Sequence, residues 1–432
     1  MNQHNKIEYL FRHEYGKLVA LLVRRMGLQK LNEIEDAVQW AMAQAVEQWN
    51  IKVSPDNPSA WLYQVAYRQM ISEIRSSQRK KELLAESFAI QEQLEAESLD
   101  REPLNIALSG ELSDSLLRML FVACNRSIPV ESQLVFTLKI LCGFSIKEIA
   151  IRLFISEANA YKRFKRASTF LKRQPLKKPN TQLDDLSNEE MVKRLPSIHR
   201  ILYLLFTEGH LSSHEDIAIR KDLCEEAIRL GVILVESFIG NVAESSALLA
   251  LMYFHIARID ARLDGMETML LQQQDRNQWD QQKIAQGLIH LQNSTQSEHI
   301  SRYHIEAGIA AEHCLSKSFE QTPWERIIIS YKLLEQVAPS PMHFLNGAIA
   351  TAEYEGAEAA LSILNSADIP KWFDHTYHWY AVLADLYFRS NQNALGKTYA
   401  TKAIDAAPTK NIKQILIKRL LSGQTYDEIK DC

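Results

Sequence analysis

Six basic residues fall within one short stretch of the chain, and this stretch has the residue types best suited to a specific chemical task. They are Lys162, Arg163, Lys165, Arg166, Lys172 and Arg173. Glu157 is the acidic residue of the same predicted helix. Lysine and arginine gathered on a helix are the groups that neutralise the phosphates of a nucleic-acid backbone. The pattern therefore predicts a surface that binds DNA.

Two short helices joined by a tight turn are expected to position these residues, over residues 145–174. Ser145 and Glu148 have the spacing of a capping box, and Ser156 can cap the second helix. The apolar residues that recur at helical spacing are Ile146, Ile149, Ala150 and Leu153, then Ala160, Phe164, Ala167 and Leu171. This is the pattern of a helix-turn-helix, whose second helix enters the major groove. An ordinary helical hairpin with a solvated basic face remains the alternative.

The basic charge is local, because the chain as a whole is slightly acidic. Its 432 residues have a formal net charge of −4. Residues 145–178 carry ten Lys or Arg and two Glu, a local balance of 10 − 2 = +8. We therefore expect one DNA-facing module attached to domains that contact protein.

Other classes of protein find little support in the sequence. The five cysteines are scattered singly, which indicates neither a zinc ribbon nor a disulfide framework. His210 and His214, or His375 and His378, have a spacing that could face a metal, but isolated histidines are more often structural, so we predict no metal and no cofactor. A phosphate-binding glycine loop, HExxH and a nucleophile elbow are missing, so we predict no enzyme. Without a signal sequence or an apolar run of about 20 residues, we expect a cytoplasmic protein with no membrane contact.

Helical periodicity runs through nearly the whole chain, so the predicted fold class is all-α. The first unit should hold three helices, the last of which begins at Asn57 and Pro58, a favourable N-cap and first-turn pair. The predicted segments are a first helical unit at 1–81, an acidic linker at 82–108, the helix-turn-helix unit at 109–174, a second linker at 175–190 and amphipathic helices at 191–432.

A tetratricopeptide-like unit can be recognised near the end of the chain. Its matching positions are Tyr380, Leu383, Ala384, Tyr387, Gly396, Ala400, Ala403 and Pro408. Such a helix pair needs neighbours to bury its apolar face, and residues 303–338 and 342–367 are the candidates. We therefore predict repeat-like helix pairs with a concave, protein-binding surface.

Taken together, these segments resemble an extracytoplasmic-function (ECF) sigma factor of the subgroup with a tetratricopeptide-like C-terminal extension. EDAVQWAMAQAVEQW is similar to the helix of sigma region two that docks on the β′ clamp of RNA polymerase, and PDNPSAWLYQVAYRQMISEIRSSQRK to the segment that melts and reads the −10 element. LLRMLFVACNRSI and TLKILCGFSIKEIAIRLFISEANAYKRFKRA resemble region four, which reads the −35 element. The signatures LYLLFTEGH, QQDRNQW and APSPMHFLNGAIA resemble the extension.

The resemblance implies a region-two helical bundle, a region-four helix-turn-helix domain and a TPR-like helical domain. It also implies a sigma factor that binds core RNA polymerase through the β′ clamp and the β flap and directs it to promoter DNA. Residues 191–432 are expected to modulate this activity through polymerase, an anti-sigma or other regulatory protein, or the DNA-binding units. Arg68 and Ser72 stand where the family usually has Asn and Asp, so the promoter sequence cannot be predicted.

Particular residues are expected to contact the −35 element and the DNA backbone. Residues near the start of a recognition helix point into the groove, and later ones meet phosphate. The predicted −35 base contacts are Glu157, Asn159, Tyr161 and Lys162, and the predicted phosphate contacts are Arg163, Lys165 and Arg166 with Arg75 and Arg79 of region two. For Glu157 the alternative is a charge that stabilises the helix N-terminus.

Other residues are expected to contact the −10 element and polymerase. Flipped bases are held by aromatic faces and pockets, at about 1–3 kcal/mol for each stacked base. The predicted −10 contacts are Tyr63, Tyr67, Arg68 and Gln69, beside the loop at 51–56. A core position is the alternative for Tyr63. Asp36 and Gln39 are the predicted clamp contacts, and ordinary surface charge is the alternative for Glu33 and Glu35.

A protein of a different class could share part of this sequence pattern. A free-standing helix-turn-helix regulator with a repeat-built sensor domain would bind a duplex operator without polymerase. That hypothesis leaves the EDAVQ helix and the SAWLYQVAYRQM segment unexplained. An enzyme fused to a DNA-binding module has no catalytic residues to support it.

Overall fold

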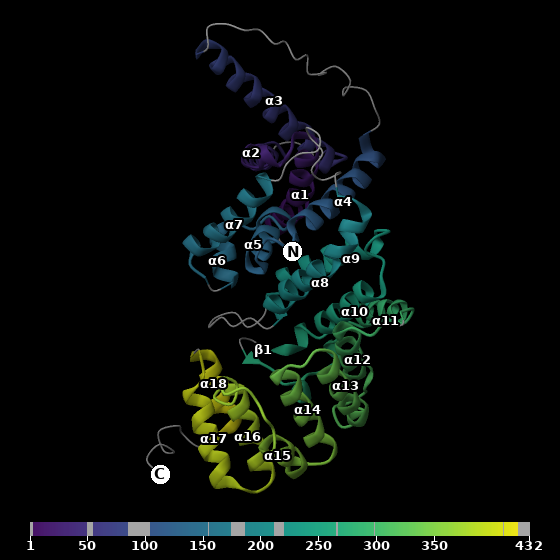
Figure 1. Ribbon diagram of the computed structural model, residues 1–432, viewed down its shortest axis with the longest axis vertical. Helices are drawn as coiled ribbons and strands as arrows, with labels where there is room; N and C mark the ends of the chain where they lie inside the picture. Colours follow the sequence, from purple (N-terminus) through teal and green to yellow (C-terminus); the bar gives the residue numbers. More distant parts are fainter. Residues whose placement is uncertain are drawn as a thin grey trace. The chain divides into compact units, whose positions relative to one another are not determined.

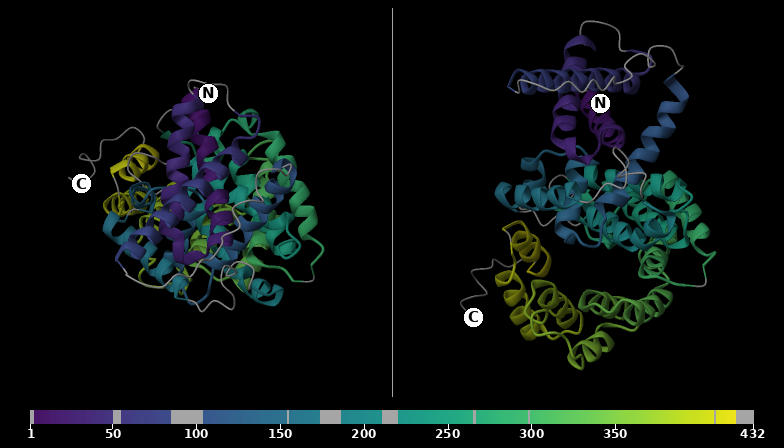
Figure 2. Two further views of the ribbon diagram at one scale, coloured as in Figure 1. Left: turned by 90° about the horizontal axis from the view of Figure 1, so that it is seen from above. Right: turned by 45° about the horizontal axis from the view of Figure 1, so that its top comes forward.

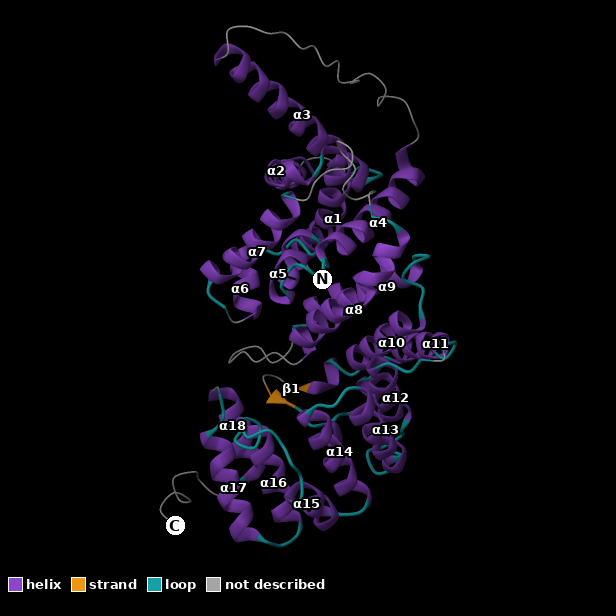
Figure 3. Cartoon of the chain, in the orientation of Figure 1, coloured by secondary structure: helices purple, strands orange, loops and turns teal. Residues whose placement is uncertain are grey.

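The computed structural model describes residues 3–49, 55–84, 104–153, 155–173, 186–210, 220–264, 267–297, 299–408 and 410–421. Helices build nearly all of this part of the chain (Figures 1 and 3), and the all-α prediction is confirmed. Within the described ranges, the β structure is a short antiparallel pair of β1 (Leu263–Asp264) and β2 (Glu267–Thr268). The chain divides into two compact units, residues 1–201 and 202–432.

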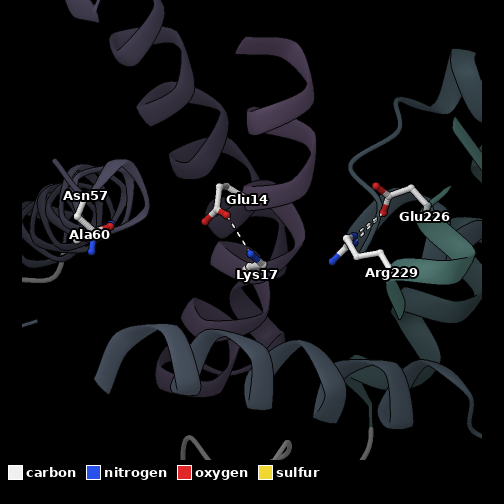
Figure 4. A network of polar contacts seen from close by, with 6 residues as sticks. All are labelled: Glu14, Lys17, Asn57, Ala60, Glu226 and Arg229. Carbon is white, nitrogen blue, oxygen red and sulfur yellow. Dashed lines mark hydrogen bonds and ion pairs between the residues drawn. The ribbon is translucent and has the colours of Figure 1, made fainter. Parts of the chain in front are cut away.

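Three helices open the first unit, which is the number predicted from the sequence. They are α1 (Gln3–Met26), α2 (Leu31–Trp49) and α3 (Pro58–Leu84), with the short 3-10 helix η1 (Leu28–Lys30) between the first two. Leu18, Leu22, Ile34, Leu62 and Met70 are fully buried in their core. The start of α3 is as predicted, because the Asn57 side chain accepts a hydrogen bond from the Ala60 N–H at 3.0 Å (Figure 4).

Four further helices of this unit carry the basic segment. They are α4 (Leu104–Ala123), α5 (Val130–Ile140), α6 (Ile146–Leu153) and α7 (Glu157–Lys172). Helix α4 begins within the segment predicted as a linker at 82–108. Proline is well tolerated just before or at the first turn of a helix, and Pro103 stands directly before this start.

Helix α8 (Asn188–His210) runs from the first unit into the second, and the remaining helices follow it in chain order. They are α9 (Lys221–Glu236), α10 (Ala243–Ala257), η2 (Asp260–Arg262), η3 (Leu271–Gln273), η4 (Arg276–Gln278), α11 (Gln281–Ser294), α12 (Arg302–Leu315), α13 (Trp324–Val337), α14 (Pro341–Tyr354), α15 (Ala357–Asn365), α16 (Tyr377–Arg389), α17 (Asn393–Asp405) and α18 (Lys410–Leu420). Figure 2 shows the last helices following one another around an arc.

The helix pair predicted near the end of the chain is α16 and α17. Leu383, Ala384, Ala400 and Ala403 are all buried, as their positions in the repeat pattern require. Gly396 allows close packing within the pair, because a Cβ atom there would lie 2.6 Å from the Phe388 ring. A C-terminal helical domain is thus present, while its likeness to tetratricopeptide repeats stays a prediction.

Candidate nucleic-acid interface

Local capping fixes the two helices that present the basic segment. The Glu148 carboxylate accepts a hydrogen bond from the Ser145 N–H at 2.8 Å, and the Glu148 N–H donates to the Ser145 hydroxyl at 3.2 Å. This is the predicted capping box. The Ser156 hydroxyl accepts from the Asn159 N–H at 3.2 Å and so caps α7. Both helices therefore start where the sequence indicates.

The inner face of α7 packs as the periodicity predicts. Ala160, Phe164, Ala167 and Leu171 are buried, and the Phe164 ring stacks on Phe136 of α5 with a centroid separation of 5.8 Å. Burying a phenylalanine side chain stabilises a fold by roughly 1.5–3 kcal/mol. The outer face of α7 is thereby held rigidly toward solvent.

Three of the predicted base-reading residues, Asn159, Tyr161 and Lys162, lie on this outer face, and Glu157 stands at the first position of the helix. Glu157, Asn159, Tyr161 and Lys162 are all exposed, and 54% of Tyr161 is accessible to solvent. Successive helical residues are about 100° apart, so Asn159 and Tyr161 point about 160° away from each other. Lys162 lies between them. A groove centred on Lys162 would therefore meet Asn159 and Tyr161 at its two edges.

The predicted phosphate contacts of α7 are partly grouped. Lys165 and Arg166 are exposed, and Arg163 is half-buried. A shallow hollow of about 570 Å³ joins several of these side chains; its lining is Lys162, Lys165, Arg166, Thr169, Phe170 and Arg173. Thr169 and Phe170 were not predicted from the sequence, because an uncharged residue on a basic helix gives no signal for phosphate binding. This cation-rich surface can accept a phosphate backbone.

Lys172 has a different environment from the other lysines of α7. Its ammonium group donates to the side-chain oxygen of Asn32 at 3.0 Å. The Gln29 amide also donates to the Lys172 carbonyl. The end of α7 is thus fastened to the turn that precedes α2, and this lysine is occupied within the protein.

Helix α3 exposes some of the predicted −10 residues and buries another. Arg68 and Arg75 are exposed, and Tyr67 and Gln69 are half-buried. Tyr63 is only 2% exposed and lies against Tyr67, with ring centroids 5.9 Å apart. Of the two alternatives for Tyr63, the structure places the ring in the core. The side chain of Arg79 and the loop residues 51–54 lie outside what is described here.

Helix α2 carries the predicted clamp residues on its exposed side. Asp36 and Gln39 are exposed, as is Trp40, of which 43% is accessible. The surface-charge alternative is wrong for Glu35, which is only 6% exposed. Its carboxylate accepts from the Tyr15 hydroxyl at 3.0 Å and pairs with the Lys139 ammonium at 2.5 Å. The pKa of Tyr15 is raised well above its usual value by burial and by the Glu35 charge.

The Lys139–Glu35 pair belongs to a direct contact between the first three helices and α4 to α7. Arg24 of α1 donates to the Asp114 carboxylate of α4 at 2.8 Å. Gly16 of α1 lies so close to α5 that a Cβ atom there would be 2.1 Å from the Leu141 carbonyl oxygen. We call this surface the α1–α5 contact; it comprises Tyr15, Gly16, Glu35, Lys139 and Leu141.

Intrachain ion pairs stabilise both units locally. Glu14 and Lys17 pair at 3.0 Å on α1, and Glu226 and Arg229 pair at 2.8 Å on α9 (Figure 4). In the described part of the chain, no group of three or more His, Cys, Asp or Glu side chains could hold a metal ion. No described helix has the length and apolar character needed to span a bilayer.

A capped helix-turn-helix with an exposed basic recognition helix defines a DNA-binding protein. Comparison with known proteins narrows this class. Residues 10–80 match sigma-70 region 2, and residues 118–171 match sigma-70 region 4. Residues 194–295 match a family of unknown function, DUF6596. An uncharacterized protein of Rhizobium meliloti is 32% identical over 357 residues, which are 80% of this chain and 81% of that protein. No solved structure gives a significant match.

The sigma-70 matches cover the region-two and region-four segments that carried the resemblance, and the DUF6596 match covers part of the extension. The chain belongs to the sigma-70 family, as an ECF sigma factor with a C-terminal extension. It binds core RNA polymerase and promoter DNA, directs promoter-specific transcription and is not an enzyme. The region-two match accounts for the segments that a free-standing regulator leaves unexplained.

Proposed function

We propose that α7 reads the −35 element and that α3 contacts the −10 element. The support for α7 is its exposed face, where Lys162 lies between Asn159 and Tyr161 and beside the cations of the hollow. Lys165 and Arg166 then bind the phosphate backbone, and the half-buried Arg163 makes a further phosphate contact at the edge of this face. On α3, Tyr67, Arg68 and Gln69 face the −10 strand, and Arg75 with Arg79 contacts its phosphates.

Polymerase is contacted through α2 and through region four in the same proposal. Asp36 and Gln39 dock on the β′ clamp, supported by their exposure on α2 beside the accessible Trp40. Region four reaches the β flap. Binding to these surfaces makes and breaks no covalent bond, so the sigma cycle is driven by binding free energy.

The α1–α5 contact supports a closed resting form of the protein. The −10 and −35 elements lie about 25 base pairs apart, which is roughly 85 Å along B-DNA at about 3.4 Å per base pair. A compact unit of about 200 residues has a radius of gyration of roughly 17 Å and hence a diameter of roughly 45 Å. Regions in contact across Glu35 and Lys139 are therefore too close to read both elements. In this proposal the contact opens when polymerase and promoter are bound.

The C-terminal domain regulates this cycle by binding a protein. A cavity of about 690 Å³ among α13, α14, α16 and α18 supports this proposal. Its wall combines aromatic side chains such as Trp324 and Tyr331 with the charged Glu353, Asp385 and Arg389. A mixed apolar and charged surface on helix pairs suits a protein segment. The partner is an anti-sigma protein, polymerase or another regulatory protein.

The test is a comparison of the full chain with a truncated chain that ends at residue 201, where the first compact unit ends. Both proteins are added to core polymerase on the same promoter, and transcript yield and promoter affinity are measured. We expect the truncated chain to initiate at the same start site with a clearly changed yield. Equal yield and equal affinity, in cell extract as well as with purified components, would refute regulation by the C-terminal domain.

A further inference from the structure

Three arginines lie together in the second unit, where α10 ends and the short helices η2 and η4 follow. They are Arg258, Arg262 and Arg276, and we call them the arginine cluster. Arg258 is only 8% exposed. Arg262 Nη1 lies 2.8 Å from His210 Nδ1 and donates to the His210 carbonyl oxygen at 2.9 Å. Arg276 Nη1 donates to the carbonyl oxygens of His313 and Ser316 at 2.8 and 2.6 Å.

The partners of the cluster are neutral groups. Arg258 Nη2 lies 3.1 Å from His255 Nδ1, and the guanidinium groups of Arg258 and Arg276 lie 5.8 and 4.4 Å from the ring centroid of Trp279. Among the residues that the structure describes, no carboxylate forms an ion pair with any of the three arginines. Glu320 interacts electrostatically with Arg276, but its carboxylate is fully exposed to solvent. Arg258 is buried and Arg262 and Arg276 are half-buried, and positive charge in such surroundings normally requires a counter-charge.

The histidines around the cluster do not supply additional charge, and neither do they neutralise it. Burial, together with the nearby charges of Arg258 and Arg276, lowers the pKa of His313 to about 3. The pKa values of His210 and His255 are lowered well below the usual value, first by burial and then by neighbouring positive groups. The arginines therefore carry the charge of this site at neutral pH.

Several hydrogen-bonding atoms at the cluster are buried without a partner. They are Arg258 Nε, Arg276 Nη2, Trp279 Nε1 and His313 Nδ1. Guanidinium and indole nitrogens can only donate hydrogen bonds, so three of these four atoms need an acceptor. A buried donor without an acceptor costs about 1–3 kcal/mol. An oxyanion bound at the cluster would supply hydrogen-bond acceptors and balance the positive charge.

A residue in contact with the cluster, His313, also lines a cavity. His313 and Tyr331 line the cavity of about 690 Å³, together with Leu270 to Gln272, which lie just before η4. Arg258 acts electrostatically on both His313 and Tyr331. The cavity therefore lies beside His313, whose carbonyl oxygen accepts a hydrogen bond from Arg276 of the cluster.

We propose that Arg258, Arg262 and Arg276, with the Trp279 indole N–H, form a binding site for a small oxyanion of the phosphate class. Two sources can supply this chemistry. One is a free anion. The other is a carboxylate of Glu215 or Asp216, which lie outside the described residues and follow His210 in the sequence. The proposal is for the free anion and does not depend on the regulatory role of the domain.

The test uses inorganic phosphate and the full-length protein. Heat of binding and thermal midpoint are measured in phosphate and in sodium chloride of matched ionic strength. We expect saturable binding and a midpoint higher by several degrees in phosphate. In Arg258→Gln, affinity should fall by about tenfold or more, because a charge-assisted donor is lost. Arg326→Gln changes an exposed arginine of the same domain and should bind as the wild type does.

Two further variants decide the remaining outcomes. Trp279→Phe keeps the buried ring, removes the donor and should weaken phosphate binding several-fold, which tests the site even if Arg258→Gln does not fold. Glu215→Gln with Asp216→Asn tests the intrachain source. Phosphate binding by the double variant but not by the wild type would overturn the proposal in favour of a carboxylate of the chain. Equal binding by wild type, Arg258→Gln and Trp279→Phe would overturn it as well.

Discussion

Gly16 offers a sharp test of the closed form, because it allows α1 and α5 to approach closely. A Cβ atom at this position would lie 2.1 Å from the Leu141 carbonyl oxygen and 2.8 Å from its carbon. Real Cβ atoms essentially never approach other atoms closer than 3.0 Å, so Gly16→Ala must separate the two helices by 3.0 − 2.1 = 0.9 Å. The atom in the way belongs to the backbone and cannot rotate aside.

The expected cost follows from two opposing effects. Overpacking a core costs about 1–3 kcal/mol. Alanine is about 1 kcal/mol better than glycine within a helix. The helix-propensity gain applies to α1 whether the contact is open or closed, so the α1–α5 contact should weaken by the overpacking cost of about 1–3 kcal/mol, while the net change in folding free energy is about 0–2 kcal/mol. Gly308→Ala on α12 is the matched control, because a Cβ atom there has nothing within 4 Å. It should gain stability.

Hydrogen exchange of backbone amides beside Leu141 reports directly on the α1–α5 contact. The Cys142 N–H donates to the Thr137 carbonyl at 3.2 Å, and the Phe144 N–H donates to the Leu138 carbonyl at 3.1 Å. These amides flank Leu141 and should exchange about tenfold faster in Gly16→Ala, since 1.4 kcal/mol is a factor of ten. Affinity for core polymerase should rise with the fraction of open protein. Unchanged exchange and affinity in Gly16→Ala would refute the closed form.

Further predictions follow from single contacts. Lys139→Met leaves the buried Glu35 carboxylate without its charge partner and should cost about 3–5 kcal/mol of folding free energy; added Glu35→Gln should restore part of it, and purely additive losses in urea unfolding would contradict this. Ser156→Ala should destabilise α7 by about 1 kcal/mol, measured by hydrogen exchange of its first turn, and normal protection would contradict the cap. Lys165→Ala should weaken binding to all promoters alike and reduce the slope of log affinity against log salt by about 1, whereas the exposed Lys332→Ala should change neither. The folded-state pKa of His313 lies at about 3, below its unfolded-state value. The contribution of the neutral His313 to the free energy of folding is therefore complete above pH 6.5 and is lost as the pH falls. At pH 5, which is about 1.5 pH units below the unfolded-state pKa of histidine, the folding free energy should have decreased by roughly 2 kcal/mol. His313→Gln should remove that part of the pH dependence of unfolding.

Local patterns made the helix-turn-helix predictable. Ser145, Glu148 and Ser156 act on backbone groups three residues away, so spacing alone indicates their contacts. The buried stripe of α7 likewise follows from helical geometry. The residues of this part of the site therefore lie on the faces that the sequence predicted.

Long-range contacts could not be predicted in the same way. Lys139 and Glu35 are 104 positions apart, and a charged residue on an amphipathic helix looks like a surface residue until its partner is known. The placement of Tyr63 depends on the packing of α3 against its neighbours. The arginine cluster was missed for the same reason, since Arg262 and His210 are 52 positions apart and meet only in the folded domain.

The most direct test of the central claim is transcription in vitro from the promoter region upstream of this protein's own coding sequence. Purified protein is added to core RNA polymerase, with core polymerase alone as the control, and the start site is mapped. The account predicts a specific transcript that depends on the protein and is lost when Lys162, Lys165 and Arg166 are changed to alanine. Absence of core binding and of initiation, with a footprint on duplex DNA by the protein alone, would contradict it.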